Sequence, residues 1–197
     1  MKPTSRFLSS DFWDDRYLTN ETGWDMGEVS PPLKNYIDQL TNKDIRILIP
    51  GCGNTYEAEY FLARGFSNIT VIDFAPTLVN KLKLKFQNTN IRVVLADFFE
   101  HSGTYDLILE QTFFCAIDPE LRSAYCGKMH SLLSENGKLV GVLFNKHFEK
   151  EGPPFGGSGN EYDHLFKNHF EFVVFESCKN SHPKRQDVEL FIVLRKK

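Results

Sequence analysis

Glycines and a carboxylate follow the first two apolar runs of the sequence, where they could bind a ligand. Residues 50–54 read Pro-Gly-Cys-Gly-Asn, and Gly51 and Gly53 would let a ligand approach the backbone closely. Asp73 ends the second run, and a carboxylate at that place can accept hydrogen bonds from both hydroxyls of a ribose. The steric demands of a tight turn, or helix capping by Asp73, would explain the same residues without a ligand.

Polar side chains also follow the third and fourth apolar runs. Asp97 precedes Phe98, and this pair could bind adenine, with the carboxylate accepting from the exocyclic amine and the ring stacking on the base. Gln111, within the polar residues 110–112, ends the fourth run. A turn acid beside a core phenylalanine is the alternative for the third run. Polar residues at the ends of four consecutive apolar runs nevertheless favour a nucleoside-binding site.

The glycine pattern argues against two common nucleotide sites. A dinucleotide fingerprint would place a third glycine at position 56, which is Tyr56 here, so close packing over a pyrophosphate is disfavoured. The GxxxxGK[ST] pattern of nucleoside triphosphate sites is absent from the sequence. A cofactor without a pyrophosphate therefore fits better.

Three aromatic residues near the N-terminus could bind a positively charged group. Trp13 and Tyr17 lie at helical spacing in DFWDDRYL, and Trp24 stands in an otherwise polar loop. Aromatic ring faces attract a cation by about 0.5–2 kcal/mol per good contact. Packing of a helix onto the rest of the protein is the alternative, and the polar loop makes that alternative weaker for Trp24.

Alternating strands and helices must position these residues. Short β-branched runs predict strands, and the amphipathic stretches between them predict helices. The predicted strands are residues 45–50, 68–74, 91–99, 104–114 and 138–145, and the predicted helices are residues 55–64, 76–86, 119–133 and 162–168. Such alternation forms a parallel sheet with right-handed crossovers, which brings the polar carboxyl ends of the strands to one edge.

The two ends of the chain depart from this alternation. Residues 170–176 and 188–196 follow one another without a helix, so they should pair as a hairpin whose last strand runs against the others. Residues 1–40 contain helices at 11–18 and from Pro31, and we expect them to form a lid. The predicted fold is α/β, a Rossmann-like sheet of seven mostly parallel strands with helices on both faces. A single domain should span residues 1–197.

The composition is that of a folded globular protein. Of 197 residues, 41% are hydrophobic and 25% are charged, and the net charge is -3. Because this charge creates no field that concentrates polyanions, we expect no nucleic-acid or membrane partner. The four cysteines form no CxxC pair and lack histidines at zinc spacing, so no metal site is expected. No signal-peptide core occurs, and we expect a soluble cytoplasmic protein.

The order of glycine loop, ribose acid, adenine acid and polar fourth end resembles the class I methyltransferases that use S-adenosylmethionine. The likeness extends to FWDDRY, TGWDMGEVSPPL, ILIPGCGNTYEAEYFLARGF, VIDFAP, ADFF, EQTFFCAIDPELRSAYCGKM and EGPPF. Together these motifs resemble the thiopurine S-methyltransferase superfamily, and FFCAIDP and TGWD are most similar to its halide/thiol (thiocyanate) methyltransferase branch. The resemblance runs from Phe12 to about Phe166. The tryptophan-bearing N-terminus and the GPPF loop make it specific, because methyltransferases in general lack them.

The resemblance implies that the residues singled out above bind S-adenosylmethionine. In such enzymes the lid aromatics contact the cofactor, the glycine loop meets its methionine end, and the two acids bind its ribose and adenine. The residues concerned here are Trp13, Tyr17, Trp24, Gly51, Gly53, Asp73, Asp97, Phe98 and Gln111. Tyr17 departs from the pattern, since many relatives have a second tryptophan there, but both residue types present a π face.

Fewer residues point to the methyl acceptor. Arg122, in DPELRSAY, matches an arginine that the thiopurine enzymes place at the substrate mouth, and a surface arginine paired with Asp118 is its alternative. Phenylalanines that could cage a substrate, or equally belong to the core, are Phe113, Phe114 and Phe155. Cys115 could be reactive, but a small buried residue is the simpler interpretation.

The implied activity is methyl transfer to a small nucleophile, such as a thiol, thiocyanate, halide or related chalcogen anion. An anionic acceptor needs no general base, so positioning and desolvation would supply most of the rate. We expect His147, His164 and His169 to be surface or loop residues rather than a base. Alternatives are an oxygen or nitrogen acceptor, or a sensor that binds the cofactor without turnover. The expected partner is a small molecule, and the expected oligomeric state is a monomer.

Overall fold

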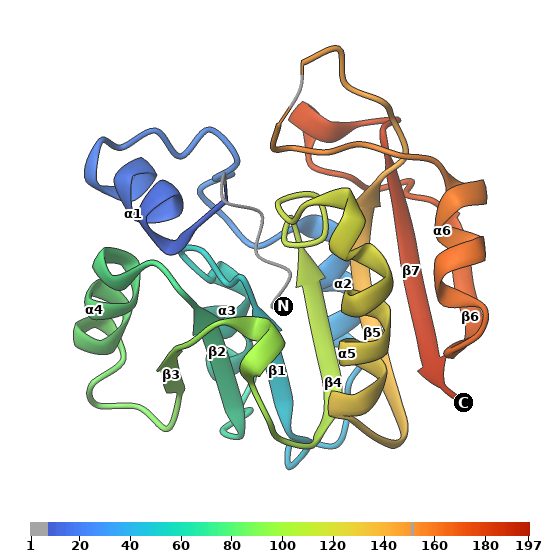
Figure 1. Ribbon diagram of the computed structural model, residues 1–197. Helices are drawn as coiled ribbons and strands as arrows, with labels where there is room; N and C mark the ends of the chain where they lie inside the picture. Colours follow the sequence, from blue (N-terminus) through green and yellow to red (C-terminus); the bar gives the residue numbers. More distant parts are fainter. Residues whose placement is uncertain (1–7, 151) are drawn as a thin grey trace.

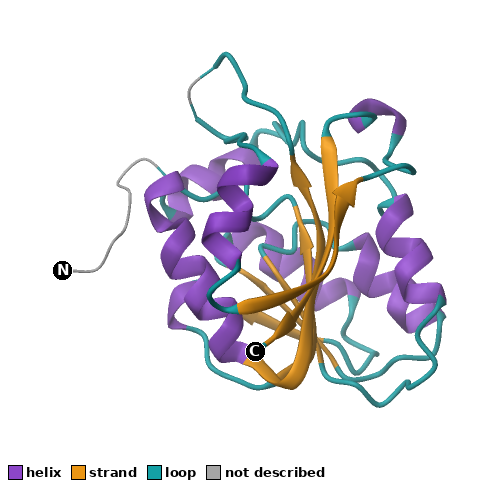
Figure 2. Cartoon of the chain, turned by 90° about the vertical axis from the view of Figure 1, so that its right-hand side faces the viewer, coloured by secondary structure: helices purple, strands orange, loops and turns teal. Residues whose placement is uncertain are grey.

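The centre of the molecule is a seven-stranded sheet in the order β3-β2-β1-β4-β5-β7-β6 (Figures 1 and 2). The computed structural model describes residues 8–150 and 152–197. The strands are β1 Ile47–Pro50, β2 Ile69–Asp73, β3 Arg92–Leu95, β4 Tyr105–Gln111, β5 Leu133–Phe144, β6 Phe170–Ser177 and β7 Glu189–Lys196. Strands β1 to β5 pair in parallel, whereas β7 is antiparallel to both β5 and β6. The predicted α/β class, strand number and antiparallel last strand are confirmed.

Helices pack on both faces of this sheet (Figure 2). One face carries α2 Pro31–Asp38, α3 Tyr56–Ala63 and α4 Pro76–Lys85, and the other carries α5 Arg122–Leu132 and α6 Gly159–Phe166. Because successive side chains of a strand point to opposite faces, Ile47 and Ile49 join the first core and Leu48 joins the second. A strand that is buried on both sides must be apolar throughout, as β1 is.

The helix α1 Ser10–Leu18 lies over the carboxyl edge of the sheet rather than on a face (Figure 1). Its first turn is capped by Ser9, whose side chain accepts from the amide of Phe12. Asp14 and Ser10 join it to the beginning of α4, through Thr77 and the carbonyl of Phe74. Of the predicted lid, residues 1–7 lie outside the described residues and α2 is instead part of the core, so the lid that the structure describes consists of residues 8–30.

Among the element boundaries that differ from the prediction, two have clear local reasons. Strand β3 ends early because the Asp97 side chain accepts from the amide of Phe99 and starts a short 3-10 turn, Phe98–Glu100. Helix α6 begins earlier than residue 162 because Ser158 and Glu161 form a capping box. Within the part of the chain that the structure describes, no helix is long and apolar enough to cross a membrane.

Candidate functional site

A cavity of about 1050 Å³ opens at the carboxyl edge of the sheet, beneath the lid. Ligand pockets for small molecules commonly have volumes of roughly 300–1,000 Å³, so this cavity could hold a cofactor together with a small acceptor. Its wall includes every residue that the sequence assigned to cofactor binding, namely Trp13, Tyr17, Trp24, Gly51, Gly53, Asp73, Asp97, Phe98 and Gln111. The fold therefore brings these separate strand ends and the lid aromatics together.

The glycine loop after β1 has left-handed backbone at both of its glycines. The φ angles are +53° at Gly51 and +52° at Gly53, a region that residues with a Cβ rarely adopt. A Cβ added at Gly51 would lie 2.2 Å from Cδ2 of Phe113, so the packing of that ring also requires glycine. At Gly53 a Cβ would meet only the Tyr17 hydroxyl, at 3.7 Å, which leaves space on the cavity side.

Asp73, at the end of β2, holds the glycine loop in place by a hydrogen bond. Its Oδ2 accepts from the amide of Gly53 at 3.3 Å, and its Oδ1 accepts from the amide of Ala75 at 3.1 Å. Burial raises the pKa of this carboxyl to about 6, although the backbone amides that bind it act in the opposite direction. Each oxygen keeps a further lone pair, so the bonds that Asp73 makes as a cap do not exclude a ligand.

Asp97 and Phe98, at the end of β3, each make a structural contact and also line the cavity. Asp97 accepts from the Phe99 amide at 2.8 Å, as a turn acid would. Phe98 is buried in the core, with its ring centroid 5.1 Å from that of Phe113. Both residues also line the cavity. They therefore act as a turn acid and a core phenylalanine, and at the same time they are placed where a ligand could contact them.

The lid aromatics form one cluster over the glycine loop. The Trp24 ring packs edge-on against the rings of Trp13 and Tyr17, with ring centroids 5.4 and 5.8 Å apart, respectively. Burial, followed by the nearby charge of Asp73, raises the pKa of Tyr17, so its hydroxyl stays protonated. The carbonyl of Trp24 accepts from Nη2 of Arg185 at 2.7 Å, and this bond fixes the lid loop to the segment before β7.

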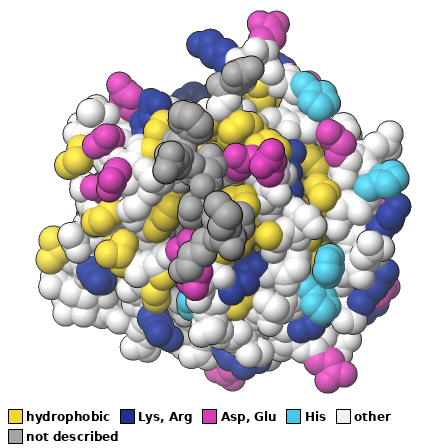
Figure 3. All heavy atoms as spheres, in the orientation of Figure 1, with side chains coloured by type: hydrophobic (Ala, Val, Ile, Leu, Met, Phe, Trp, Pro, Cys, Tyr) yellow, Lys and Arg dark blue, Asp and Glu magenta, His cyan; other side chains and the backbone are white. Residues whose placement is uncertain are grey.

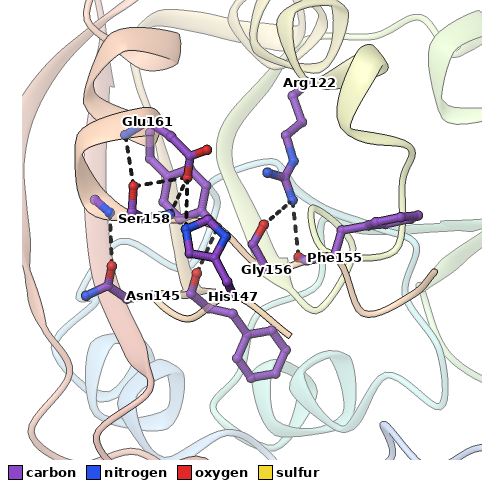
Figure 4. Close-up of polar contacts among 10 residues, drawn as sticks. Arg122, Asn145, His147, Phe155, Gly156, Ser158 and Glu161 are labelled. Atoms are coloured by element: carbon purple, nitrogen blue, oxygen red, sulfur yellow. Dashed lines mark hydrogen bonds and ion pairs between the residues drawn. The ribbon is translucent and has the colours of Figure 1, made fainter. Parts of the chain in front are cut away.

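Arg122 is not among the residues that line the cavity. Its buried side chain donates from Nη2 to the carbonyls of Phe155 and Gly156, at 3.1 and 3.0 Å (Figure 4). Its guanidinium also lies over the Phe114 ring, 4.6 Å from the centroid. Arg122 is therefore not a surface residue paired with Asp118, and it fixes the loop that follows β5 from behind the cavity wall.

Only one of the three candidate cage phenylalanines reaches the cavity. Phe113 lines it, whereas Phe114 is fully buried between α5 and α6, and Phe155 belongs to the loop held by Arg122. Cys115 also lines the cavity, and its thiol donates to the Thr112 carbonyl at 3.2 Å. Burial raises the pKa of this thiol to about 12, which suits a packed thiol rather than a nucleophile.

Comparison with known proteins identifies the chain. The profile of the thiopurine S-methyltransferase family matches residues 8–194. The chain belongs to this family. A relative named probable thiol methyltransferase 2, from Arabidopsis thaliana, is 30% identical over 79% of this chain and 71% of its own length. Thiocyanate methyltransferase 1 of Brassica oleracea is 26% identical over 77% of this chain and 69% of its own.

The fold of this methyltransferase recurs among solved structures. The 1,6-didemethyltoxoflavin-N1-methyltransferase of Burkholderia thailandensis, solved with bound S-adenosylhomocysteine, superimposes with a TM-score of 0.77. That comparison covers 100% of this chain and 93% of the other, at 19% sequence identity, so it shows a common fold. Family membership makes the protein an S-adenosylmethionine-dependent methyltransferase of the predicted Rossmann-like class.

The cavity of this methyltransferase fits S-adenosylmethionine. Gln111 Oε1 is buried in the wall without a hydrogen-bond partner among the described residues, which leaves an acceptor for a ligand. Asp73 offers carboxylate lone pairs to hydroxyl groups, and the lid offers aromatic rings to a cation. The wall thus offers acceptors to the hydroxyl and amino groups of the cofactor and aromatic rings to its charged sulfur.

Several wall residues of the methyltransferase were not found from the sequence. Among them are Phe144, Lys146, Phe148 and Arg185, whereas Pro153 and Pro154 belong to the GPPF motif. The rule that located the first four strand ends, applied to the end of β5, would have indicated Phe144 and Lys146. No local pattern marks Arg185, which stands in a polar turn of the sequence and is buried only in the folded chain.

The histidines lie where the sequence placed them. His147 and His164 are exposed, with 74% and 72% of their side chains accessible, and His169 is in the turn before β6. None of the three lines the cavity. Over residues 8–150 and 152–197, no three histidine, cysteine or acidic side chains are grouped so that they could hold a metal ion.

Proposed function

We propose that this methyltransferase acts on a small, soft nucleophile, such as a thiol, thiocyanate or halide. The observation that carries the proposal is the wall near Cys115, where Phe144, Phe148 and prolines stand beside one buried guanidinium, that of Arg185. Such a wall suits a weakly hydrated anion, because it removes water, and Arg185, which is paired with Glu189 at 3.5 Å, keeps the surroundings from being purely acidic. The names of the plant relatives support the same class of acceptor.

We propose that the strand ends and the lid hold the cofactor as the resemblance implies. Asp73 would accept from the ribose hydroxyls, and Asp97 would accept from the adenine amine while Phe98 packs against the base. The methionine end would meet the glycine loop, with Gln111 as a further acceptor. The cofactor supplies an electrophilic methyl group on a positively charged sulfur, which the rings of Trp13, Tyr17 and Trp24 would stabilise.

Positioning and exclusion of water are the contributions that we assign to the protein. The lid and the loop of residues 145–150 and 152–158 both line the cavity, so together they could enclose an acceptor. Arg122 and the capping box of α6 fix that loop by hydrogen bonds of Phe155, Gly156 and Ser158 (Figure 4). A desolvated anion held in line with the methyl group needs no proton transfer, so no general base is assigned.

A small acceptor is also favoured over a macromolecular one. Basic and acidic side chains are interspersed on the face drawn in Figure 3, and no continuous basic stripe crosses its described part. A nucleic-acid backbone would require such a stripe. The single domain, the monomeric state and the cytoplasmic location stay predictions, and size-exclusion chromatography would test the monomer.

Calorimetry followed by an acceptor panel tests the proposed function. S-adenosylmethionine and S-adenosylhomocysteine should bind, and NAD should not, because position 56 is tyrosine rather than the third glycine of a dinucleotide site. Turnover should then occur with hydrosulfide, thiocyanate, iodide or an aryl thiol, and not with a phenol or an amine of matched size. Binding without any turnover would identify a sensor module, and turnover of the phenol or amine alone would overturn the acceptor class.

A further inference from the structure

Residues 111–115 form a turn at the end of β4 that belongs to both halves of the cavity. Gln111, Thr112, Phe113 and Cys115 all line it. The Phe113 ring lies against the glycine loop and against Phe98, on the side we assign to the cofactor. Thr112 and Cys115 face the side we assign to the acceptor. The shape of this turn therefore sets the distance between the two halves.

The backbone of the turn is not one that its residues adopt by preference. Thr112 has a φ of +60°, in the left-handed region that β-branched residues avoid. A residue persists in this strained region only where its surroundings fix it. Something must therefore hold the turn in this conformation.

Glu110, the residue before the turn, supplies that restraint. Its Oε1 accepts from the amides of Phe113 and Phe114, at 2.8 and 2.9 Å. Its Oε2 accepts from the hydroxyl of Tyr125 on α5, at 2.5 Å. The Glu110 side chain is fully buried, and a Cβ added at Gly141 of β5 would lie 2.4 Å from its Cβ, so the carboxyl group has little freedom to move.

The neighbours of Glu110 indicate that its acceptor atoms, rather than its charge, hold the turn. Burial raises the pKa of this carboxyl to about 7, and Tyr125 and the two amides act against that shift. Glu110 also lines a small cavity of about 10 Å³ behind the turn, together with Cys115, Arg185 and Glu189. Protonation at Oε2 would leave Oε1 as a carbonyl oxygen with two lone pairs, enough for both amides.

We propose that Glu110 is a positioning residue for methyl transfer: through the amides of Phe113 and Phe114 it fixes the turn that joins the cofactor side of the cavity to the acceptor side. The inference rests on the proposed function. It assigns Glu110 no contact with the substrate or the cofactor, because Glu110 is absent from the residues that line the large cavity.

Three variants of the full-length protein test this role, with kcat for a thiol acceptor and the dissociation constant of S-adenosylhomocysteine as the readouts. Glu110→Gln keeps a carbonyl oxygen for both amides and can donate to the Tyr125 oxygen, so it should retain kcat within about threefold. Glu110→Met keeps the length but removes the acceptor, and its kcat should fall by about 100-fold, the effect of a misplacement near 1 Å. Its affinity for S-adenosylhomocysteine should change far less.

Tyr125→Phe is the matched control, because it removes a buried hydrogen bond to Glu110 but leaves the two bonds to the turn. It should lower the melting temperature while kcat stays near that of the wild type. If Glu110→Met fails to fold, Glu110→Asp takes its place, since the shorter side chain withdraws the acceptor from the amides and should still lower kcat.

The outcomes separate this inference from the proposed function. Wild-type kcat in folded Glu110→Met or Glu110→Asp overturns the positioning role alone, as does an equal loss of kcat in Tyr125→Phe. A failure of Glu110→Gln to restore turnover also overturns it. A wild-type protein that binds S-adenosylhomocysteine but methylates none of the acceptors overturns the proposed function, and the positioning role with it.

Discussion

Burial sets the chemistry of individual side chains around the cavity. Asp73 and Glu110 are both shielded from water, which raises their pKa values to about 6 and about 7. Two carboxyl groups that would be fully ionised in solution therefore titrate near neutral pH. Asp73 lines the cavity and Glu110 lies behind it, so only the titration of Asp73 should be coupled directly to cofactor binding.

The affinity for S-adenosylhomocysteine should fall in mild acid because of Asp73. In the proposed role the ionised carboxylate would accept from both ribose hydroxyls, so affinity should be highest above the pKa and decrease as the pH drops through 6. Between about pH 7.5 and about pH 5 the dissociation constant should rise roughly tenfold. Calorimetry across this range would measure it. Asp73→Asn should bind more weakly at every pH and lose this dependence, and a parallel pH profile in that variant would contradict the assignment.

The ring of Trp24 should discriminate the charged cofactor from its neutral product. Trp24→Leu removes a π face, so the affinity for S-adenosylmethionine should fall by about 1–2 kcal/mol, and the affinity for S-adenosylhomocysteine by less. Competition binding with both ligands measures the difference. Trp24→Phe keeps a ring and should lose only part of the discrimination. Equal losses for the two ligands would mean that Trp24 contributes packing and no interaction with the charge.

At the scale of elements, the lid is attached where a helix leaves its backbone groups unpaired. The first amides of an α-helix have no partner within it, and those of α4 follow Pro76. Asp14 of α1 accepts from the Thr77 amide at 2.6 Å and from its hydroxyl at 3.0 Å. One carboxylate thus caps α4 and anchors α1. Figure 1 shows the two helices side by side.

Removing this anchor should loosen the lid. Asp14→Ala should raise the rate of proteolytic cleavage within residues 8–30 of the cofactor-free protein by roughly tenfold, the equivalent of about 1.4 kcal/mol for two lost bonds. Limited proteolysis followed by mass spectrometry would locate and time the cuts. Asp15→Ala, which changes an exposed neighbour on the same helix, should leave the rate unchanged. Saturating S-adenosylhomocysteine should restore protection in Asp14→Ala, and equal cleavage of the two variants would exclude the anchor.

At the scale of the whole molecule, the N-terminal lid is joined to the last hairpin. Arg185, before β7, donates to the Trp24 carbonyl and pairs with Glu189 at 3.5 Å. Both side chains of that pair are buried, and burial raises the pKa of Glu189. Figure 1 shows the lid and the turns around β5 and β7 at the same edge of the sheet. The cavity is therefore closed by segments from both ends of the chain.

The Arg185 pair should be costly to break and much less costly to replace. Arg185→Met leaves Glu189 without its charge partner in a buried place and should lower the unfolding free energy by about 3–5 kcal/mol. The double variant Arg185→Met, Glu189→Met should regain most of that loss, because no unpaired charge remains. Urea unfolding measures both. Both variants lack the bond to Trp24, so both should bind S-adenosylhomocysteine more weakly. A double variant no more stable than the single one would contradict this account.

The sequence by itself determined the sheet, its polar edge and most of the cavity residues that we assign to the cofactor. Apolar runs and helix signals are local, and the rule that parallel strands present their carboxyl ends at one edge converts them into positions in space. This is why Asp73, Asp97 and Gln111 could be assigned to one site before the fold was known, and all three line the cavity.

Only the tertiary structure decided which neighbouring side chains line the cavity. Phe113 and Phe114 are adjacent and identical, yet the left-handed backbone at Thr112 directs one to the cavity and the other into the core. Arg122 matched a substrate arginine by motif but binds loop carbonyls, whereas Arg185 matched nothing and reaches Trp24. These outcomes depend on a strained turn and on contacts between distant segments, and neither leaves a periodic pattern in the sequence.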